Sequence, residues 1–139
     1  MSMEGPSLEQ LLSTYTSGFD ERSTTLLLFH CFKAIQCVHE LGVAHGDITL
    51  KNLCMPKSQM KGRILLLDFG CLIPFNTIAG RNDVAAICMC IELVSSHHLL
   101  LAEVRRFHTQ NTTSSIEDLI EMIRSSHHFN ENDPFQWEA

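Results

Sequence analysis

The sequence of 139 residues has no stripe of basic residues, no long apolar run and no C-x-x-C pair. Ten Lys and Arg stand against sixteen Asp and Glu, which gives a formal charge of −6 and argues against binding nucleic acid through charge. No apolar run approaches the roughly 20 residues that a membrane-spanning helix needs. The segment Met1–Pro6 lacks the basic and apolar regions of a signal peptide. We therefore expect an intracellular protein, cytoplasmic or nuclear, without a membrane partner.

The cysteines favour reduced, buried thiols over a metal or redox site, because they lie mostly in apolar stretches. The pair Cys88-x-Cys90 falls on an expected helix, where residues two apart point to different faces. The histidine pairs His97-His98 and His127-His128 have no matching cysteine cluster, so we expect no structural zinc. The six cysteines are Cys31, Cys37, Cys54, Cys71, Cys88 and Cys90.

The composition, with 45% apolar and 19% charged residues, indicates one folded domain over residues 1–139. Ser7 and Gln10 fit a capping box that begins a first helix. Asp20 or Ser23 is expected to cap a long second helix, which ends near residue 41 ahead of Gly42.

The second half of the chain predicts three further helices. Asp83–Val94 is apolar almost all round, which is typical of a buried helix. Shorter helices are expected over Leu99–Phe107 and from Ser115 onward. The segment 71–82 has Pro74, Asn76 and Gly80 and no clear period, so it is interpreted as a loop. The polar tail over residues 129–139 is expected to be partly flexible.

Two short apolar runs, residues 52–55 and 63–67, are separated by a mostly polar turn and predict a β-hairpin. The expected fold class is therefore mainly α with a small β-hairpin.

Chemistry is concentrated in His45-Gly46-Asp47-Ile48-Thr49-Leu50-Lys51-Asn52 and in Asp68-Phe69-Gly70. Asp47 and Asn52 lie five apart on an expected loop, and Asp68 follows an expected strand. Two carboxylates and one amide oxygen are hard ligands that suit Mg²⁺, and one carboxylate could instead accept a proton from an attacking hydroxyl. Taken singly, each residue also fits a loop cap or a turn.

These motifs resemble the C-terminal lobe of the protein kinase superfamily. His45-x-Asp47-(x4)-Asn52 is similar to the catalytic loop, and Leu67-Asp68-Phe69-Gly70 is similar to the metal-binding DFG motif. The resemblance covers residues 3–95 well and residues 96–139 weakly.

The resemblance implies a role for each matching residue. Asp47 would be the catalytic base, and Asn52 and Asp68 would hold Mg²⁺ and the cofactor ATP. Lys51 would neutralise phosphate charge near the base, although a solvated loop lysine is an equal alternative. His45 would be structural, and Asp83 would hold the backbone of the catalytic loop.

Several family features are not found in the sequence. No G-x-G occurs, and Lys33, which lies inside the long helix, is the only lysine ahead of the catalytic loop. Gly46 replaces the usual arginine, and Thr49 stands where Ser/Thr kinases carry a lysine. The segment 68–83 is short and has no Ala-Pro-Glu.

These departures imply a truncated kinase-like domain that acts as a non-catalytic, pseudokinase-type regulatory or interaction module. Its partner would be a protein such as another kinase or a small-lobe subunit. One alternative is a fragment or isoform of a Ser/Thr-type or atypical kinase that transfers the γ-phosphate of ATP once a small lobe completes it. A second alternative is a self-sufficient small-molecule or atypical kinase. The His-Gly-Asp-Ile-Thr form is similar to the atypical kinase of the tRNA threonylcarbamoylation complex, and equally to divergent viral kinases and small-molecule phosphotransferases.

Overall fold

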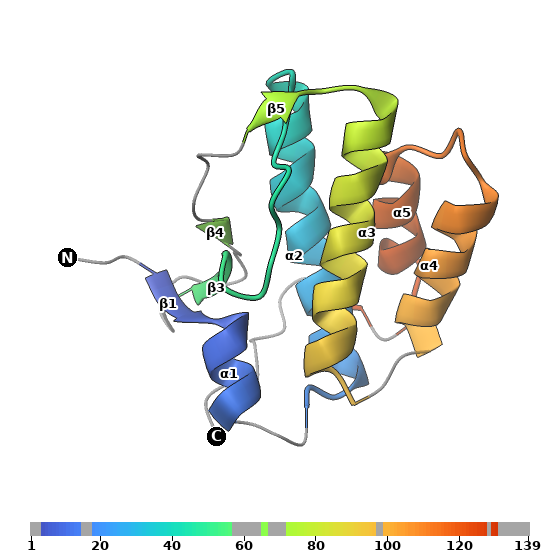
Figure 1. Ribbon diagram of the computed structural model, residues 1–139. Helices are drawn as coiled ribbons and strands as arrows, with labels where there is room; N and C mark the ends of the chain where they lie inside the picture. Colours follow the sequence, from blue (N-terminus) through green and yellow to red (C-terminus); the bar gives the residue numbers. More distant parts are fainter. Residues whose placement is uncertain are drawn as a thin grey trace.

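The computed structural model of the chain describes residues 4–14, 18–56, 65–66, 72–96, 99–127 and 129–130. Five helices dominate this part of the chain (Figure 1), and the expected mainly α fold with a small hairpin is confirmed. The helices are α1 (Leu8–Thr14), α2 (Glu21–Glu40), α3 (Thr77–Val94), α4 (Leu99–Gln110) and α5 (Ile116–Arg124). The strands are β1 (Glu4–Ser7), β2 (Val43–Ala44), β3 (Leu53–Pro56), β4 (Leu65–Leu66) and β5 (Ile73–Pro74).

The predicted hairpin is present as β3 and β4, which pair antiparallel with Leu53 opposite Leu66. Strand β1 lies along the other edge of β3 and completes a small sheet in the order β1-β3-β4. A second, two-stranded sheet joins β2 to β5. The two sheets bracket residues 45–52, because β2 ends just before this segment and β3 begins just after it.

The first two helices begin where the sequence indicates. The backbone N–H of Gln10 donates to Oγ of Ser7 at 3.2 Å, and the backbone N–H of Ser7 donates to Oε1 of Gln10 at 2.9 Å, so the capping box is confirmed. Asp20 caps α2 by accepting from the backbone N–H of Ser23 at 2.8 Å. Gly42 follows α2 with φ of +86°, a conformation that favours glycine.

Helix α3 begins six residues earlier than expected, so the prediction of a loop over residues 71–82 is wrong for residues 73–74 and 77–82. Asn76 is the N-cap, and its side chain accepts from the backbone N–H of Ala79 at 2.8 Å. Gly80 lies in the first turns of α3, where the ring of Phe75 packs so closely that only a residue without a side chain fits. A Cβ at Gly80 would lie 2.6 Å from Cε1 of Phe75.

The prediction that α3 is buried all round is also wrong. One face packs into the core through residues such as Val84, Ile87 and Ile91. The opposite face leaves Met89 59% exposed and Leu93 61% exposed. The helix therefore has one buried and one exposed apolar face. Because the sequence is apolar on both faces, its pattern could not show which face is buried.

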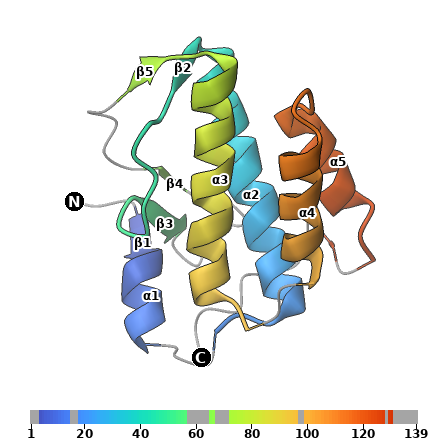
Figure 2. The same ribbon diagram turned by 45° about the vertical axis from the view of Figure 1, so that its right-hand side comes forward.

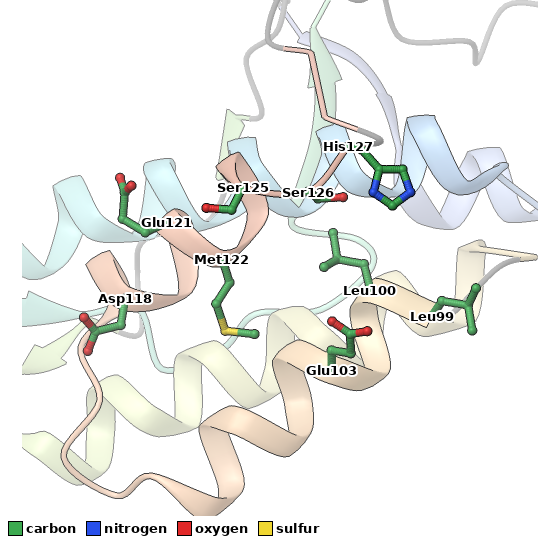
Figure 3. A pocket seen from close by; sticks show the side chains of 9 residues that line it. All are labelled: Leu99, Leu100, Glu103, Asp118, Glu121, Met122, Ser125, Ser126 and His127. Atoms are coloured by element: carbon green, nitrogen blue, oxygen red, sulfur yellow. The ribbon is translucent and has the colours of Figure 1, made fainter.

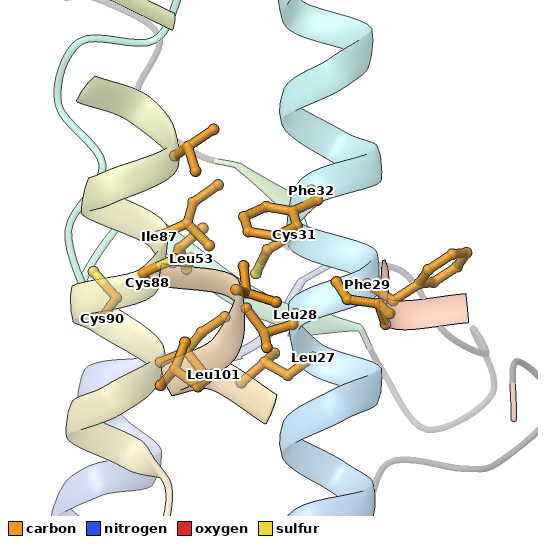
Figure 4. Packing of buried hydrophobic residues seen from close by; sticks show 14 of the residues in the cluster. Leu27, Leu28, Phe29, Cys31, Phe32, Leu53, Ile87, Cys88, Cys90 and Leu101 are labelled. Atoms are coloured by element: carbon orange, nitrogen blue, oxygen red, sulfur yellow. The ribbon is translucent and has the colours of Figure 1, made fainter. Parts of the chain in front are cut away.

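The core lies where α2 and α3 run side by side in opposite directions (Figures 1 and 2). Helices α4 and α5 pack on the same side of this pair, and α5 contributes Leu119, Ile120 and Ile123 to the core. Figure 4 shows the central packing of α2 against α3, with Leu101 of α4 and Leu53 of β3 beside it. Burying this surface is the main source of stability and fixes the segment that joins α2 to β3.

The cysteines agree with the expected buried thiols, with one exception. Cys31, Cys54, Cys88 and Cys90 are buried, whereas Cys37 is exposed. Cys71 lies outside the described residues. Within the described part of the chain, no helix combines the length and apolar character needed to cross a membrane.

Candidate functional site

The centre of the site is Asp83 of α3, which holds the backbone of residues 45 and 46. Its side chain is only 3% exposed. One carboxylate oxygen accepts from the backbone N–H of His45 at 2.8 Å, and the other accepts from the backbone N–H of Gly46 at 3.0 Å. The predicted contact between Asp83 and this loop is therefore confirmed.

His39 of α2 completes the set of donors around Asp83. Its Nε2 lies 2.9 Å from Oδ2 of Asp83, and a carboxylate can only accept, so the imidazole donates. Burial by itself would raise the pKa of Asp83. The hydrogen bonds from His39, Gly46 and His45 outweigh burial and hold the pKa below its usual value. Asp83 therefore stays ionised at neutral pH.

Sequence reasoning missed His39, although a signal was available. His39 lies four residues after Ile35, which is fully buried in the same helix, so both residues face the core side. A polar side chain on that face needs a partner, and Asp83 is that partner.

A second hydrogen bond shapes the loop around Asp47. The side-chain nitrogen of Asn52 donates to the backbone carbonyl of Asp47 at 2.6 Å. The structure thus brings together two of the predicted site residues. Because the amide nitrogen is used in this way, the side-chain oxygen of Asn52 is the atom that can bind a cation.

The loop is also fixed at both of its ends. The buried His45 accepts from the backbone N–H of Asp47 at its Nδ1, at 3.1 Å, in agreement with the expected structural role. Near the other end, the backbone N–H of Glu9 donates to the carbonyl of Leu50 at 3.2 Å. Two helix residues, Asp83 and Glu9, and two residues of the loop itself, His45 and Asn52, therefore hold a segment that has no regular structure of its own.

Asp47 and Lys51 are more accessible to solvent than the buried residues that hold the loop. Asp47 is half-buried, and Lys51 is exposed in the turn that precedes Asn52. Residues 67–71, which include the second expected metal ligand Asp68, lie outside the described residues. Of the predicted Mg²⁺ ligands, the structure therefore places only Asn52, whose amide oxygen is the hard type of ligand that Mg²⁺ takes.

A hollow of about 730 Å³ lies between α4 and the end of α5, and none of the predicted site residues lines it. Figure 3 shows the side chains around it. Leu99, Leu100 and Met122 form its apolar part. Two of its carboxylates already have partners, because Asp118 belongs to the α5 capping box and Glu121 pairs with Arg124 at 2.7 Å. Across the described residues, no group of three or more His, Cys, Asp or Glu side chains could hold a metal ion.

Comparisons with known proteins agree with a kinase-like relationship. The chain is 30% identical over 71 residues to the B1 kinase of monkeypox virus, which aligns 51% of this chain with 23% of that protein. It is 37% identical over 71 residues to two Caenorhabditis elegans proteins named as serine/threonine-protein kinases, ZK507.1 and ZK507.3. Half of this chain aligns in each case, with 22% and 19% of those proteins. No protein-family model matches the chain.

The chain spans about a fifth of the length of these curated relatives. Half of it is thus similar to part of proteins that are named as kinases. Together with the fold and with the hydrogen bonds that hold residues 45–52, this similarity supports a kinase-like relationship for the chain.

Proposed function

We propose that residues 45–52 form the catalytic loop of a kinase-like fold, and that the 139-residue chain acts by itself as a pseudokinase-type regulatory or interaction module. The evidence for this assignment is the set of hydrogen bonds that hold the loop. Asp83 accepts from two backbone amides of the loop, and Asn52 donates to the carbonyl of Asp47. The similarity to kinase-named proteins covers half of the chain and supports the same assignment.

Each site residue has a role in this proposal. Asp47 is the catalytic base that a complete kinase site would use. In such a complete site Asn52 and Asp68 would hold Mg²⁺ together with ATP, and Lys51 would neutralise phosphate charge. When bound, Mg²⁺ supplies charge neutralisation at the transferred phosphate.

The chain alone offers little to position a nucleotide. Phosphoryl transfer depends mainly on positioning and on electrostatic stabilisation of the phosphates. The 139-residue sequence has no G-x-G, and its one lysine ahead of the loop, Lys33, lies within α2. Mg²⁺ bound by two side chains also needs substrate phosphates to complete its coordination. We therefore expect no phosphoryl transfer by the chain alone.

The observation that carries the interaction role is an apolar end of the molecule around the β2–β5 sheet. Five of the eight large apolar side chains that are exposed among the described residues belong to this end. The pairing of β2 with β5, and a hydrogen bond of 3.0 Å from the N–H of Phe75 to the carbonyl of Gly42, join the two segments that carry them. Clustered exposed apolar side chains mark protein-binding surfaces. These residues, here named the apolar end, are Leu41, Leu72, Ile73, Phe75 and Ile78.

A phosphoryl-transfer assay tests the first part of the proposal. The purified chain is incubated with Mg·ATP labelled at the γ-phosphate, beside the Asp47→Asn variant. We expect the same background hydrolysis from both proteins. Turnover by the wild type that disappears in Asp47→Asn would contradict the proposal and favour a self-sufficient kinase.

Matched variants test the interaction role. The double variant Ile73→Asp/Ile78→Asp alters the apolar end, and Met89→Asp alters an exposed apolar residue of α3 outside it. Chemical crosslinking in cells followed by mass spectrometry should detect a protein, such as a kinase, that crosslinks to the wild type and to Met89→Asp but not to the double variant. Identical crosslinking by all three proteins would count against the apolar end as the binding surface.

A second candidate function is phosphoryl transfer once a nucleotide-covering lobe is supplied. It is favoured by the hydrogen bond between Asn52 and the carbonyl of Asp47. This bond orders the two residues for catalysis, and a module that only binds a partner would not need that order. Fusion of the chain behind the small lobe of an active kinase tests it. Turnover that requires both Asp47 and Asp68 would support this function, whereas an inactive but folded fusion would argue against it.

A further inference from the structure

The hollow between α4 and the end of α5 is a surface that the proposed function leaves unused (Figure 3). Its volume is about 730 Å³, and neither the 45–52 loop nor the apolar end contributes a residue to it. Six of its nine lining residues are exposed, so the hollow is open to solvent. Small-molecule sites enclose most of their ligand. An open hollow of this size therefore suits a segment of another chain better than a small molecule.

The floor of the hollow is apolar. Leu100 of α4 is buried and Met122 of α5 is half-buried, and Figure 3 shows both side chains between the two helices. Leu99 also lines the hollow and is 75% exposed. Removing such apolar surface from water is favourable. A partner with apolar side chains can therefore gain binding energy here.

The polar side chains around this floor are mainly acidic. The carboxylates of Glu103, Asp118 and Glu121 line the hollow, and no lysine or arginine does. Arg124 pairs with Glu121 and offsets its charge. Asp118 accepts from the backbone N–H of Ser115 at 2.9 Å, a neutral donor that leaves the charge uncompensated. The Glu103 carboxylate has no partner among the described residues, so two of the three negative charges are not balanced.

These charges decide between the possible occupants. The C-terminal residues 131–139 include Glu131, Asp133 and Glu138 and no lysine or arginine, so the acidic hollow would repel them. A second copy docked about a two-fold axis would place the same carboxylates against each other. A basic segment of a different protein is attracted both by the hollow and by the net charge of −6.

We propose that this hollow binds a segment of a partner protein that is rich in lysine and arginine and carries large apolar side chains. The apolar side chains cover Leu99, Leu100 and Met122, and the basic groups pair with Glu103 and Asp118. The hollow shares no residue with the apolar end or with the 45–52 loop. The proposal therefore stands or falls separately from the proposed function.

A short amphipathic peptide serves as the probe, namely the acetylated amide of Arg-Leu-Lys-Lys-Leu-Leu-Arg-Lys-Leu. Its leucines are spaced so that they share one face of a helix. One control peptide has glutamate in place of every arginine and lysine, and the other has serine in place of every leucine. Each peptide is titrated into the full 139-residue chain in 0.15 M NaCl, and ¹H–¹³C spectra report the methionine methyl groups.

The methionine spectra show where the peptide binds. We expect the Met122 methyl resonance, assigned with Met122→Leu, to move with a Kd of about 0.1 mM. The resonance of Met89, which is exposed on α3 outside the hollow, should stay in place. Both control peptides should bind at least about tenfold more weakly, because one lacks the opposite charge and the other lacks the apolar contact.

Matched variants test the two kinds of contact. Glu103→Lys should weaken binding of the basic peptide about tenfold. Glu40→Lys changes the net charge equally but lies at the end of α2 outside the hollow, and it should change the Kd less than about twofold. Leu99→Ser should weaken binding about threefold to tenfold, whereas Leu93→Ser on the exposed face of α3 should not. All four positions are exposed, so the variants should fold.

Several results would overturn the proposal. They are a Met122 resonance that does not move at 1 mM basic peptide, a control peptide that binds as tightly, and equal binding by Glu103→Lys and Glu40→Lys. A peptide of residues 131–139 that binds as tightly as the basic peptide would assign the hollow to the chain's own C-terminal segment instead. Dimerisation in analytical ultracentrifugation that Glu103→Lys abolishes would assign it to a second copy.

Discussion

Removing the carboxylate of Asp83 should destabilise the fold, because Asp83 joins α3 to α2 and to the 45–52 loop. Asp83→Ala leaves three donors without an acceptor, namely Nε2 of His39 and the backbone N–H groups of His45 and Gly46. Gly46 is exposed, so water can replace its lost bond. His45 is fully buried and His39 is nearly so, and their donors would lose a partner that water cannot easily replace.

The magnitude follows from those two buried donors. An unsatisfied buried donor costs about 1–3 kcal/mol, and about 1.5 kcal/mol for each of two gives about 3 kcal/mol for Asp83→Ala. Asp83→Asn should cost less, about 1–2 kcal/mol. Its amide can turn so that the oxygen faces His39 and His45 while the nitrogen faces only the exposed Gly46. Urea titration of the full chain measures both values, and for a domain of this size about 3 kcal/mol corresponds to a Tm lowered by about 10 °C.

The pH dependence provides an independent check on Asp83. Its pKa in the folded protein is lowered, so its stabilising effect is present above the unfolded-state pKa of about 3.9 and is lost as the pH falls through the folded value. The side chain of Asp83→Asn does not titrate. The stability difference between wild type and Asp83→Asn should therefore be constant between pH 5 and 7 and should shrink below about pH 4.

Glu103→Gln is the control for loss of an acidic side chain, because Glu103 is exposed on α4. It should change the free energy of unfolding by less than about 0.5 kcal/mol. If Asp83→Ala costs no more than Glu103→Gln, or if the difference between wild type and Asp83→Asn does not change with pH, the structural role assigned to Asp83 is wrong.

Three further predictions concern packing, capping and thiol reactivity. Ile87→Ala, on the buried face of α3, should lower the unfolding free energy by about 3 kcal/mol, whereas Leu93→Ala on the exposed face should change it by less than about 0.5 kcal/mol. Equal effects in urea titration would refute the two-faced helix. Ser115→Ala should cost about 1 kcal/mol by the same measurement, because it removes the hydroxyl oxygen that accepts from the backbone N–H of Asp118 at 3.2 Å, and an unchanged midpoint would contradict this. In a Cys71→Ser background at pH 8, a thiol reagent should label Cys37 in the native protein and the buried thiols only after denaturation. Labelling of several thiols before unfolding would contradict the described burial.

The low reactivity expected of the buried thiols has a physical cause. Burial is the largest effect on Cys88 and raises the pKa of its thiol to about 12, with a smaller opposing effect from Arg105. Burial raises the pKa of Cys90 to about 11 and also raises that of Cys31. The reactive form is the thiolate, which is scarce at pH 8 for each of these groups.

The elements that the sequence predicts well are those with a local cause. Helix α2 has a capping aspartate at Asp20, apolar residues at helical spacing and a glycine at its end, and all of these signals lie within the element. The α5 capping box at Ser115 is equally local. Strand β1 contains Gly5 and Pro6, and it is a strand because β3 pairs with it. Sequence propensity alone cannot show such a contact.

The start of α3 shows how tertiary packing overrides a local signal. Gly80 is typical of a loop, yet in the structure it allows the ring of Phe75 to approach the helix. In the site, too, some residues could be predicted from the sequence and others depend on contacts with distant parts of the chain. Residues 45–52 and Asp83 were identified through their resemblance to a family, and the structure confirms that Asp83 holds the loop backbone. His39 was missed because its partner, Asp83, lies on another helix.

The most direct measurement of the central claim is a thermal melt of the purified chain with and without 5 mM Mg·ATP, with Asp68→Asn as the control. We predict a shift in Tm of less than about 1 °C for both proteins, because the chain alone cannot position the nucleotide. A ligand at a hundred times its Kd stabilises a fold by about 2.7 kcal/mol, which would raise the Tm by several degrees. A shift of that size that disappears in Asp68→Asn would contradict the claim, and would show that this chain binds nucleotide at its own site.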